Sequence, residues 1–159
     1  MKIIKNFLPL NQYNFLKEQI QSNEFPWYFN EYTVTPDTQF QFIHSFYYMH
    51  KQQSNLFPLI NPIIELIDPA LLFRVKINLN PQTSSIIETG MHKDLQDSRF
   101  KSSVLFFNTC DGYLKLKNNN PILSEDNKLV TFDSCIEHTG STTTNEKRRI
   151  VMTIIYLPK

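Results

Sequence analysis

Three side chains in the second half of the chain have the types and spacing of a metal site. His92 and Asp94 stand two positions apart, and on an extended backbone residues two apart project from the same face. An imidazole nitrogen and a carboxylate oxygen therefore point toward one place. His138 adds a second imidazole if its strand folds opposite the first. Two histidines and one carboxylate occupy one triangular face of a metal ion and leave its other positions open to reactants.

A guanidinium near the C-terminus stands where an anion-binding group would be useful. Arg149 follows His138 by eleven positions and opens the apolar run 150–156. A charge at the start of a buried strand needs a permanent anionic partner, and the planar fork of an arginine suits a carboxylate. A dicarboxylate co-substrate would provide that partner. Because open sites of two histidines and one carboxylate are typical of non-haem Fe(II) oxygenases, the combination predicts oxidative metal chemistry.

Each of these residues also has an ordinary structural interpretation. An H-x-D triplet arises by chance in many proteins, and a single histidine is more often a surface or half-buried residue. Asp94 is compatible with a turn, because the polar run 96–98 follows it, and 147–149 is compatible with a solvated basic turn. Cys135 stands three residues before His138, but a thiolate suits this iron chemistry poorly, so we assign it to packing. Two histidines, an aspartate and an arginine in this order favour the metal site.

The order of His92, Asp94, His138 and Arg149 ahead of a terminal apolar strand resembles the H-x-D…H…R signature of Fe(II)/2-oxoglutarate-dependent dioxygenases. The resemblance covers roughly residues 70–157. It implies that the first three residues bind Fe(II), that 2-oxoglutarate chelates the iron, and that Arg149 pairs with the far carboxylate of 2-oxoglutarate. It also implies hydroxylation of a substrate by dioxygen, with decarboxylation of 2-oxoglutarate to succinate and ascorbate as the reductant.

Two further residues are candidates for contact with 2-oxoglutarate. Thr153 lies four positions after Arg149 on the same strand face, and its hydroxyl can donate to a carboxylate, as an equivalent hydroxyl does in related enzymes. Asn78 lies on the polar face of the strand 74–80, where a structural role explains it equally well. Arg148 is the alternative to Arg149. We prefer Arg149 because it shares a face with Thr153, and a shift of one residue would reverse this choice.

The runs 108–113, 127–133 and 137–140 look like those of small prolyl 4-hydroxylase-like members of this family that bacteriophages carry. This resemblance implies a protein or peptide substrate, with proline as the hydroxylated residue. Two alternatives stay open. One is the same chemistry on a free amino acid, another small metabolite or a nucleobase, although base demethylases of the family carry a further arginine where this chain has Ile155. The other is a non-enzymatic β-sandwich binding module.

The elements that must position these residues change in character near residue 70. Apolar residues at helical spacing predict helices over about 11–21 and 57–67, and Pro69 must end the second. Strict alternation predicts a strand over 39–46. Beyond residue 70, short β-type runs separated by turns predict an antiparallel barrel or sandwich. These strands are expected at 72–79, 85–92, 103–107, 128–132 and 149–156, with a weaker one at 113–117.

The expected fold class is therefore α+β and mainly β. The family resemblance makes the β part a double-stranded β-helix, a cupin-like jelly-roll core, with N-terminal helices buttressing one sheet. The loops 25–35 and 93–102 are the candidates for the mouth of its pocket. Only three glycines occur, and Gly90 and Gly140 lie two positions from His92 and His138, which predicts permissive backbone around the histidines.

Composition limits the remaining possibilities. A chain of 159 residues has room for one full core, so we expect a single oxygenase domain over residues 1–159. A formal net charge of +1 gives a nucleic-acid partner no support. No stretch reaches the roughly 20 apolar residues of a membrane span, and the opening residues are too polar for a signal peptide. With only two cysteines, we expect a cytoplasmic protein, in the host cytoplasm if a phage encodes it.

Four aromatic or histidine residues outside this set have roles that the sequence leaves open. His44 lies on an aromatic strand face, which favours a hydrogen-bonded core histidine over a ligand. Trp27 and Tyr28 are consistent either with an aromatic wall for a peptide or proline ring, or with the core. Tyr113 either lines the mouth or packs.

Overall fold

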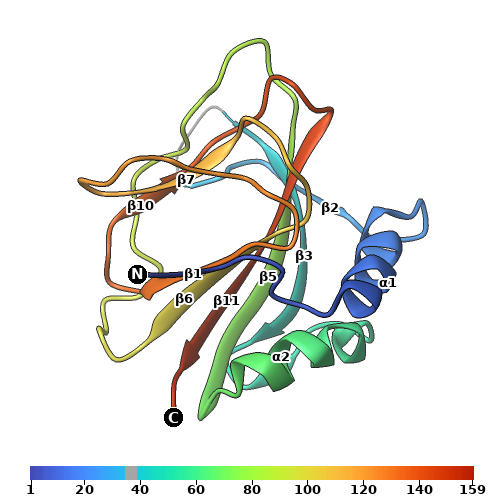
Figure 1. Cartoon of the computed structure of the whole chain (residues 1–159), viewed down its shortest axis with the longest axis vertical. Coiled ribbons are helices and arrows are strands. Elements are labelled where there is room, and N and C mark those ends of the chain that lie inside the picture. The colour runs from blue at the N-terminus through green and yellow to red at the C-terminus, as the bar shows by residue number, and fades with distance from the viewer. Residues whose placement is uncertain (35–38) are drawn as a thin grey trace.

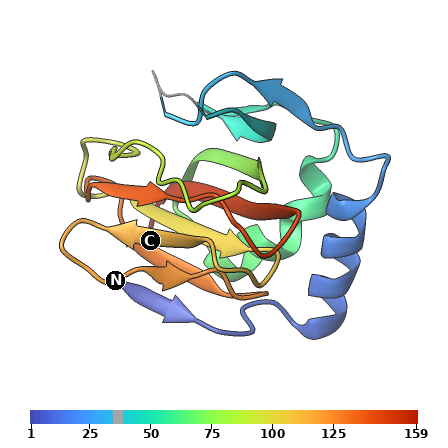
Figure 2. The same cartoon turned by 90° about the horizontal axis from the view of Figure 1, so that it is seen from above.

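The computed structural model describes residues 1–34 and 39–159, and two antiparallel sheets form its frame. The strands are β1 Lys2–Ile4, β2 Tyr28–Asn30, β3 Gln41–Tyr48, β4 Lys51–Gln52, β5 Leu71–Pro81, β6 Lys101–Phe106, β7 Tyr113–Leu116, β8 Ile122–Leu123, β9 Leu129–Asp133, β10 His138–Gly140 and β11 Arg148–Leu157. The large sheet has the order β1-β9-β6-β11-β5-β3-β2, with β4 paired to β3, and the small sheet has the order β10-β7-β8. The small sheet lies opposite the large one (Figure 1), while β1 and β2 lie at the two edges of the large sheet (Figure 2). The fold is the expected jelly-roll.

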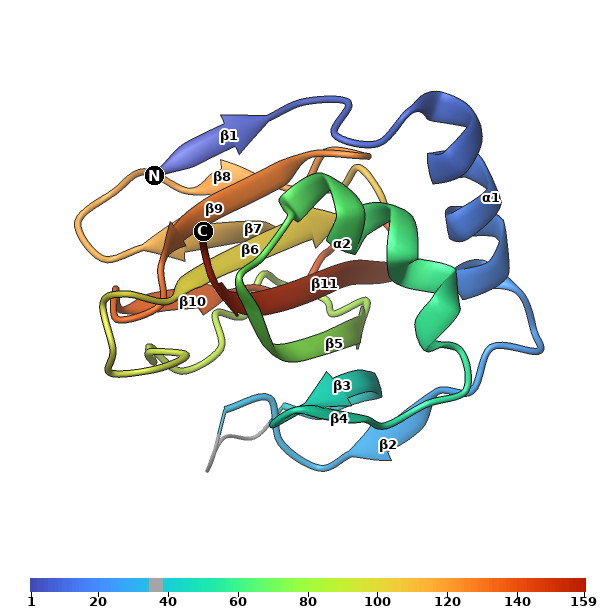
Figure 3. The same ribbon diagram turned by 90° about the horizontal axis from the view of Figure 1, so that it is seen from below.

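Helices cover one face of the large sheet. Helix α1 spans Leu10–Gln21, and a 3-10 turn at Phe57–Ile60 leads directly into α2 at Asn61–Ile67. Figure 3 shows α2 lying across β11 and β6, with α1 beside it. Helix α1 turns Tyr13, Leu16 and Ile20 inward, which is the spacing that predicts it. Among the residues that the structure describes, no helix has the length and apolar character needed to cross a membrane.

Strand β11 sends alternate side chains into two different cores. Toward the helices it turns Ile150, Met152 and Ile154, whose cross-strand neighbours on β5 belong to the same cluster. Toward the small sheet it turns Val151, which packs in a second cluster. The buried members of that second cluster are Val104, Phe106, Leu114, Leu116, Val130, Phe132 and Val151. The space between the sheets is therefore only partly filled by apolar side chains, and the rest of it is the pocket described below.

Most of the predicted elements are present, with ends that differ by one or two residues. The helix predicted at 11–21 is α1, and the one at 57–67 is the 3-10 turn with α2. Five of the six predicted strands beyond residue 70 correspond to β5, β6, β7, β9 and β11. The sequence does not predict β1, β2, β4, β8 or β10, because two or three residues are too few to show a period of two.

The strand predicted at 85–92 is wrong. The chain there leaves the large sheet and runs along the edge of the small one, with isolated bridges at Glu88 to Ser141 and His92 to His138. Side-chain hydroxyls replace part of the ladder, since the Ile87 amide donates to the Thr142 hydroxyl at 2.9 Å. Alternation in the sequence predicts which way side chains point. It does not predict whether a backbone carbonyl or a side-chain hydroxyl accepts the hydrogen bond of each backbone amide.

Candidate active site

His92 and His138 are held side by side by a single backbone bridge. The amide of His92 donates to the carbonyl of His138 at 3.0 Å, and the amide of His138 donates to the carbonyl of His92 at 2.9 Å. Residues directly opposite each other in such a pair project to the same side. The two imidazole rings are accordingly 4.4 Å apart between centroids, and both line the pocket between the sheets.

Both histidines present the same ring nitrogen to the pocket. The Nδ1 of His92 is 3.0 Å from the carbonyl of Gly90, and the Nδ1 of His138 is 3.0 Å from the carbonyl of Ile136. A carbonyl only accepts, so each Nδ1 carries a proton, and in the neutral imidazole Nε2 is then the nitrogen with a free lone pair. Burial lowers the pKa of His138, which favours this neutral form. The neutral imidazole is the form that binds a metal ion.

Asp94 is the third member of the cluster, and its carboxylate is held from two sides. Its side chain is 3% exposed. Arg74 donates to one carboxylate oxygen at 2.5 Å, and the Ser102 hydroxyl donates to the other at 2.7 Å. That second oxygen lies 3.6 Å from the Nε2 of His138. The sequence does not identify Arg74 or Ser102, although the polar residues at alternate positions of β5 are a signal that this face lines a site.

The donor set fits a divalent metal ion such as iron. The ligand atoms of His92, Asp94 and His138 all lie within 4.8 Å of one another. Two neutral imidazole nitrogens and one carboxylate oxygen form the facial set that leaves positions open for reactants. Hydrogen bonds from both Nδ1 atoms to backbone carbonyls, and from Arg74 and Ser102 to the two carboxylate oxygens, orient the ligands, as partners of metal ligands commonly do.

The inner faces of β5 and β11 extend this cluster into a polar pocket. Four cross-strand pairs follow one another: Arg74 with Ile155, Lys76 with Thr153, Asn78 with Val151, and Asn80 with Arg149. All of these except Ile155 line the same pocket as the three candidate ligands. The structure therefore brings together all six residues that the sequence singles out, which are His92, Asp94, His138, Arg149, Thr153 and Asn78.

Arg149 is buried at the far end of this pocket, with 3% of its surface exposed. Its Nε donates to the Ser124 hydroxyl at 2.8 Å and its Nη1 to the carbonyl of Ser141 at 3.3 Å. None of the carboxylates in residues 1–34 and 39–159 forms an ion pair with it. Burial lowers the pKa of Arg149 to about 10, so it is charged at neutral pH. Arg148 is exposed and points away from the pocket, toward an outer groove.

Solved structures resemble this chain, although no family model and no curated protein matches its sequence. A prolyl hydroxylase from Trichoplax adhaerens, in complex with a peptide of hypoxia inducible factor, aligns with a TM-score of 0.70 at 16% identity, over 98% of this chain and 82% of that one. A prolyl-4-hydroxylase from Pseudomonas putida gives 0.61 at 16%, over 99% and 92%. HygX from Streptomyces hygroscopicus, with nickel and 2-oxoglutarate bound, gives 0.62 at 10%, over 99% and 82%. The chain has the 2-oxoglutarate/Fe(II) oxygenase fold.

Within this fold, the pocket has the features of a binding site for a carboxylate. Arg149 is a buried cation without a carboxylate partner among the described residues, and such a charge is costly to leave uncompensated. The side-chain oxygen of Asn78 is also buried without a hydrogen-bond partner there. The oxygen and the amino group of an asparagine side chain have nearly the same shape, so a flip of the amide lets Asn78 present either one to the pocket. A dicarboxylate satisfies both residues.

Glycine is required beside Arg149 for space. A Cβ on Gly112 would lie 2.5 Å from the Cδ of Arg149 and 2.7 Å from the carbonyl of Thr142. A Cβ on Gly140 would lie 3.5 Å from the Nη1 of Arg149, which is an ordinary contact, so the tight fit is at Gly112 alone of these two. None of the three glycines has a positive φ, and residues such as Asn118 and Asn127 adopt that conformation instead. The expectation of permissive backbone around the histidines is therefore wrong.

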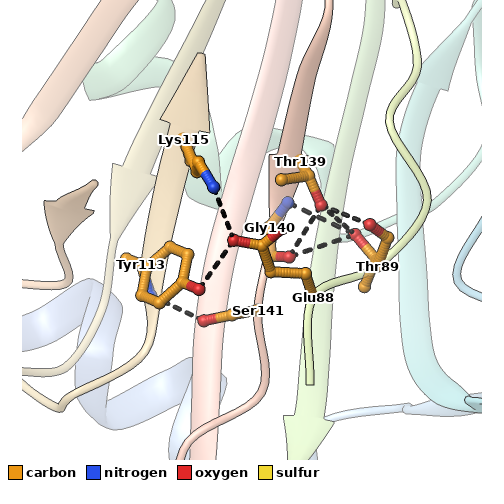
Figure 4. A network of polar contacts seen from close by, with 7 residues as sticks. All are labelled: Glu88, Thr89, Tyr113, Lys115, Thr139, Gly140 and Ser141. Carbon is orange, nitrogen blue, oxygen red and sulfur yellow. Dashed lines mark hydrogen bonds and ion pairs between the residues drawn. The ribbon is translucent and has the colours of Figure 1, made fainter. Parts of the chain in front are cut away.

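A polar network anchors the irregular segment that carries His92 (Figure 4). The hydroxyl of Tyr113 donates to the Glu88 carboxylate at 2.8 Å, and Lys115 pairs with the same oxygen at 3.1 Å. The hydroxyls of Thr89 and Thr139 are 3.2 Å apart. Tyr113 and Lys115 belong to β7, so the network ties the segment to the small sheet. Tyr113 therefore anchors this segment and is absent from the pocket lining.

The remaining sequence predictions have mixed outcomes. His44 is confirmed as a core histidine, since it is 3% exposed and hydrogen-bonded to Pro26 and Ser54. Trp27 packs against the helix-side cluster, and Tyr28 is 61% exposed. Neither lines the pocket. The two loops predicted at the mouth do reach it, and they contribute Asn30, Tyr32, Thr33, Val34, Lys93 and Asp94 to its outer part.

Proposed function

We propose that this protein is an Fe(II)- and 2-oxoglutarate-dependent dioxygenase whose single domain spans residues 1–159. One observation carries the proposal: two histidines, an aspartate and a buried arginine that has no carboxylate partner among the described residues converge on one pocket of an oxygenase fold. We further propose that its substrate is a residue of a protein or peptide, with proline as the first candidate. The two prolyl hydroxylases among the similar structures support this choice.

Each residue of the pocket has a distinct role in this proposal. His92, Asp94 and His138 hold Fe(II), and Arg149 binds the far carboxylate of 2-oxoglutarate. When bound, iron and 2-oxoglutarate let dioxygen place one oxygen atom on a substrate carbon and the other in succinate, with release of carbon dioxide. The hydroxyl of Thr153 and the amide of Asn78 orient the co-substrate by hydrogen bonds. Because hydrogen bonds already hold the three ligands and Arg149 in place, the site can bind the metal ion and 2-oxoglutarate without rearranging.

The cellular setting is also part of the proposal. Both cysteines are free thiols, with Cys110 buried and Cys135 half-buried. Free thiols persist in a reducing compartment, which supports a cytoplasmic location. Such a compartment also supplies a small reductant, and ascorbate is the one we expect to keep the iron ferrous.

The test is succinate formation from 2-oxoglutarate by the purified protein with Fe(II), ascorbate and oxygen. We expect Asp94→Ala to abolish turnover in a folded protein, because it removes a ligand. Asp97→Ala is the matched control and should leave turnover unchanged, since that half-buried carboxylate of the same loop pairs, among the described residues, only with Arg99. Turnover that survives Asp94→Ala would overturn the metal assignment.

Substrate class is read from the same assay. Stimulation of succinate formation by a proline-rich peptide, together with a hydroxylated product, supports the peptide proposal. Stimulation by free proline alone would favour the amino-acid alternative. Absence of both turnover and metal-dependent binding of 2-oxoglutarate would leave a binding module as the better explanation.

A further inference from the structure

The pocket wall has more basic side chains than there are carboxylates to pair with them, counting the described residues and the co-substrate. In the part of the pocket lined by described residues, three cations, Arg74, Lys76 and Arg149, face one carboxylate, that of Asp94. Arg74 is paired with Asp94 at 2.5 Å. In the proposed function, Arg149 would form an ion pair with the far carboxylate of 2-oxoglutarate. Lys76 is left over.

Lys76 lies in the middle of the pocket wall. It stands on β5 between Arg74 and Asn78, and its cross-strand neighbours are Thr153 on β11 and Ser45 on β3. Its side chain is half-buried and borders both the inner pocket and the outer part of the mouth. Within residues 1–34 and 39–159, no side chain or backbone group forms a hydrogen bond or an ion pair with its ammonium group.

The surroundings of Lys76 work against its charge. Burial and the neighbouring Arg74 lower the pKa of Lys76 to about 8, and Asp94 opposes the shift only in part. A partly buried ammonium group without a counter-ion is unfavourable, and a bound anion would remove that cost. An inward-pointing lysine in the middle of a sheet is therefore hard to explain by packing alone.

Loading the site does not supply the missing anion. A divalent metal ion and the dianion of 2-oxoglutarate cancel each other's charge. Under the proposed function one carboxylate of 2-oxoglutarate would bind the metal and the other would bind Arg149, so neither would be left for Lys76. No carboxylate among residues 1–34 and 39–159 pairs with Lys76, so in this proposal the further anion belongs to the substrate, and Lys93 at the mouth adds to the attraction.

We propose that Lys76 is a specificity-determining residue that binds a carboxylate of the substrate. This inference rests on the proposed oxygenase function and deepens it. A single ammonium group matches a singly charged carboxylate, which an acidic side chain of a peptide or the free carboxylate of an amino acid can provide. Because Lys76 lies next to Arg74, which holds a metal ligand, a carboxylate bound there brings the neighbouring carbon to the metal centre.

The test compares carboxylates with their uncharged amides. The probes are acetate against acetamide, N-acetylproline against N-acetylprolinamide, and blocked peptides whose proline is followed by glutamate or by glutamine. Binding is measured as thermal stabilisation of the protein loaded with Zn(II) and 2-oxoglutarate, which does not depend on turnover. Succinate formation with Fe(II) is measured beside it. The second pair and the third pair distinguish a small molecule from a peptide as the source of the carboxylate.

Three variants sharpen the comparison. In the wild type we expect at least one carboxylate to bind about tenfold more tightly than its amide, the scale of one charge-assisted hydrogen bond. Lys76→Met should remove this preference, and Lys76→Arg should keep part of it. Lys51→Met removes an exposed lysine of β4 and serves as the control that keeps the full preference. Circular dichroism establishes that each variant is folded.

The outcomes separate the inference from the function on which it rests. Equal binding of every carboxylate and its amide would overturn the role of Lys76, as would a preference that survives Lys76→Met. Loss of 2-oxoglutarate binding in folded Lys76→Met and Lys76→Arg would assign Lys76 to the co-substrate and overturn the inference as well. Failure of the wild type to bind 2-oxoglutarate with Zn(II) or to form succinate would instead count against the proposed function.

Discussion

Strands β5 and β11 present an apolar face to the helices and a polar face to the pocket. Alternate residues of the same two strands form the two faces. On the helix side, Val75, Ile77, Met152 and Ile154 are fully buried. On the pocket side, the same strands carry Arg74, Lys76, Asn78, Asn80, Arg149 and Thr153. A shift of either strand by one residue would exchange the two sets of side chains between the helix side and the pocket side.

This difference shows that stability and chemistry are divided between alternate positions. Burial of an aliphatic side chain stabilises the fold by about 1.5–3 kcal/mol, and the helix-side face consists of such residues. The pocket side buries charges such as Arg149, which cost free energy until a ligand binds. The apolar face therefore supports a site that would be unfavourable alone.

The largest expected effect is the loss of co-substrate binding in Arg149→Met. Removing one partner of a buried ion pair costs about 3–5 kcal/mol, so affinity for 2-oxoglutarate should fall by about two to three and a half orders of magnitude. Stability should not fall, because an uncompensated buried charge is also removed. Arg148→Met is the matched control and should change affinity by less than about twofold. Calorimetric titration of the Zn(II)-loaded protein checks both, and similar losses in the two variants would contradict the inward position of Arg149.

On the other face of the same strand pair, Ile77→Ala should give the opposite pattern. Truncating a fully buried isoleucine should lower the free energy of unfolding by about 2–5 kcal/mol. The affinity of the folded protein for 2-oxoglutarate should stay within about twofold, because Ile77 points away from the pocket. Urea unfolding and titration on the same samples measure the two quantities. A loss of affinity without a loss of stability would show that the faces are not separate.

Gly112→Ala should weaken the site through sterics. The added methyl group would lie 2.5 Å from the Cδ of Arg149, so the arginine must move away from Ser124. We expect affinity for 2-oxoglutarate to fall by about tenfold, the scale of one hydrogen bond to a charged group. Gly90→Ala is the control, because the nearest atom to its Cβ is at 3.5 Å, an ordinary contact. Equal affinities in the two variants would mean that the pocket absorbs the methyl group.

The smallest expected effect concerns pH and the helix-side core. Burial lowers the pKa of His44, so the folded state binds a proton less readily than the unfolded state. Its contribution is present above the unfolded pKa of about 6.5 and is lost as pH falls through the folded value. Stability should therefore decrease between pH 7 and pH 5, and His44→Asn should reduce that decrease. Denaturant unfolding at both pH values measures it, and an unchanged pH dependence would point to other groups.

The candidate site is predicted from the sequence to an unusual extent because its parts are local patterns. His92 and Asp94 are two residues apart, so they lie on one face wherever the backbone is extended. Arg149 and Thr153 are four residues apart and share a strand face for the same reason. Arg74, Ser102 and Gly112 are not predicted. Arg74 and Ser102 act through Asp94, which lies 20 and 8 residues away along the chain, and no periodic pattern records such a contact.

What the sequence alone determined was direction: which side chains share a face, and which types of donor they offer. These follow from the period of an extended chain, which depends only on neighbouring residues. The tertiary structure decided distance. It brought His138 opposite His92, fixed Arg149 rather than Arg148 inside the pocket, and left Lys76 without a partner among the described residues. Closure of the two sheets sets these relations, because it depends on the packing of both cores at once.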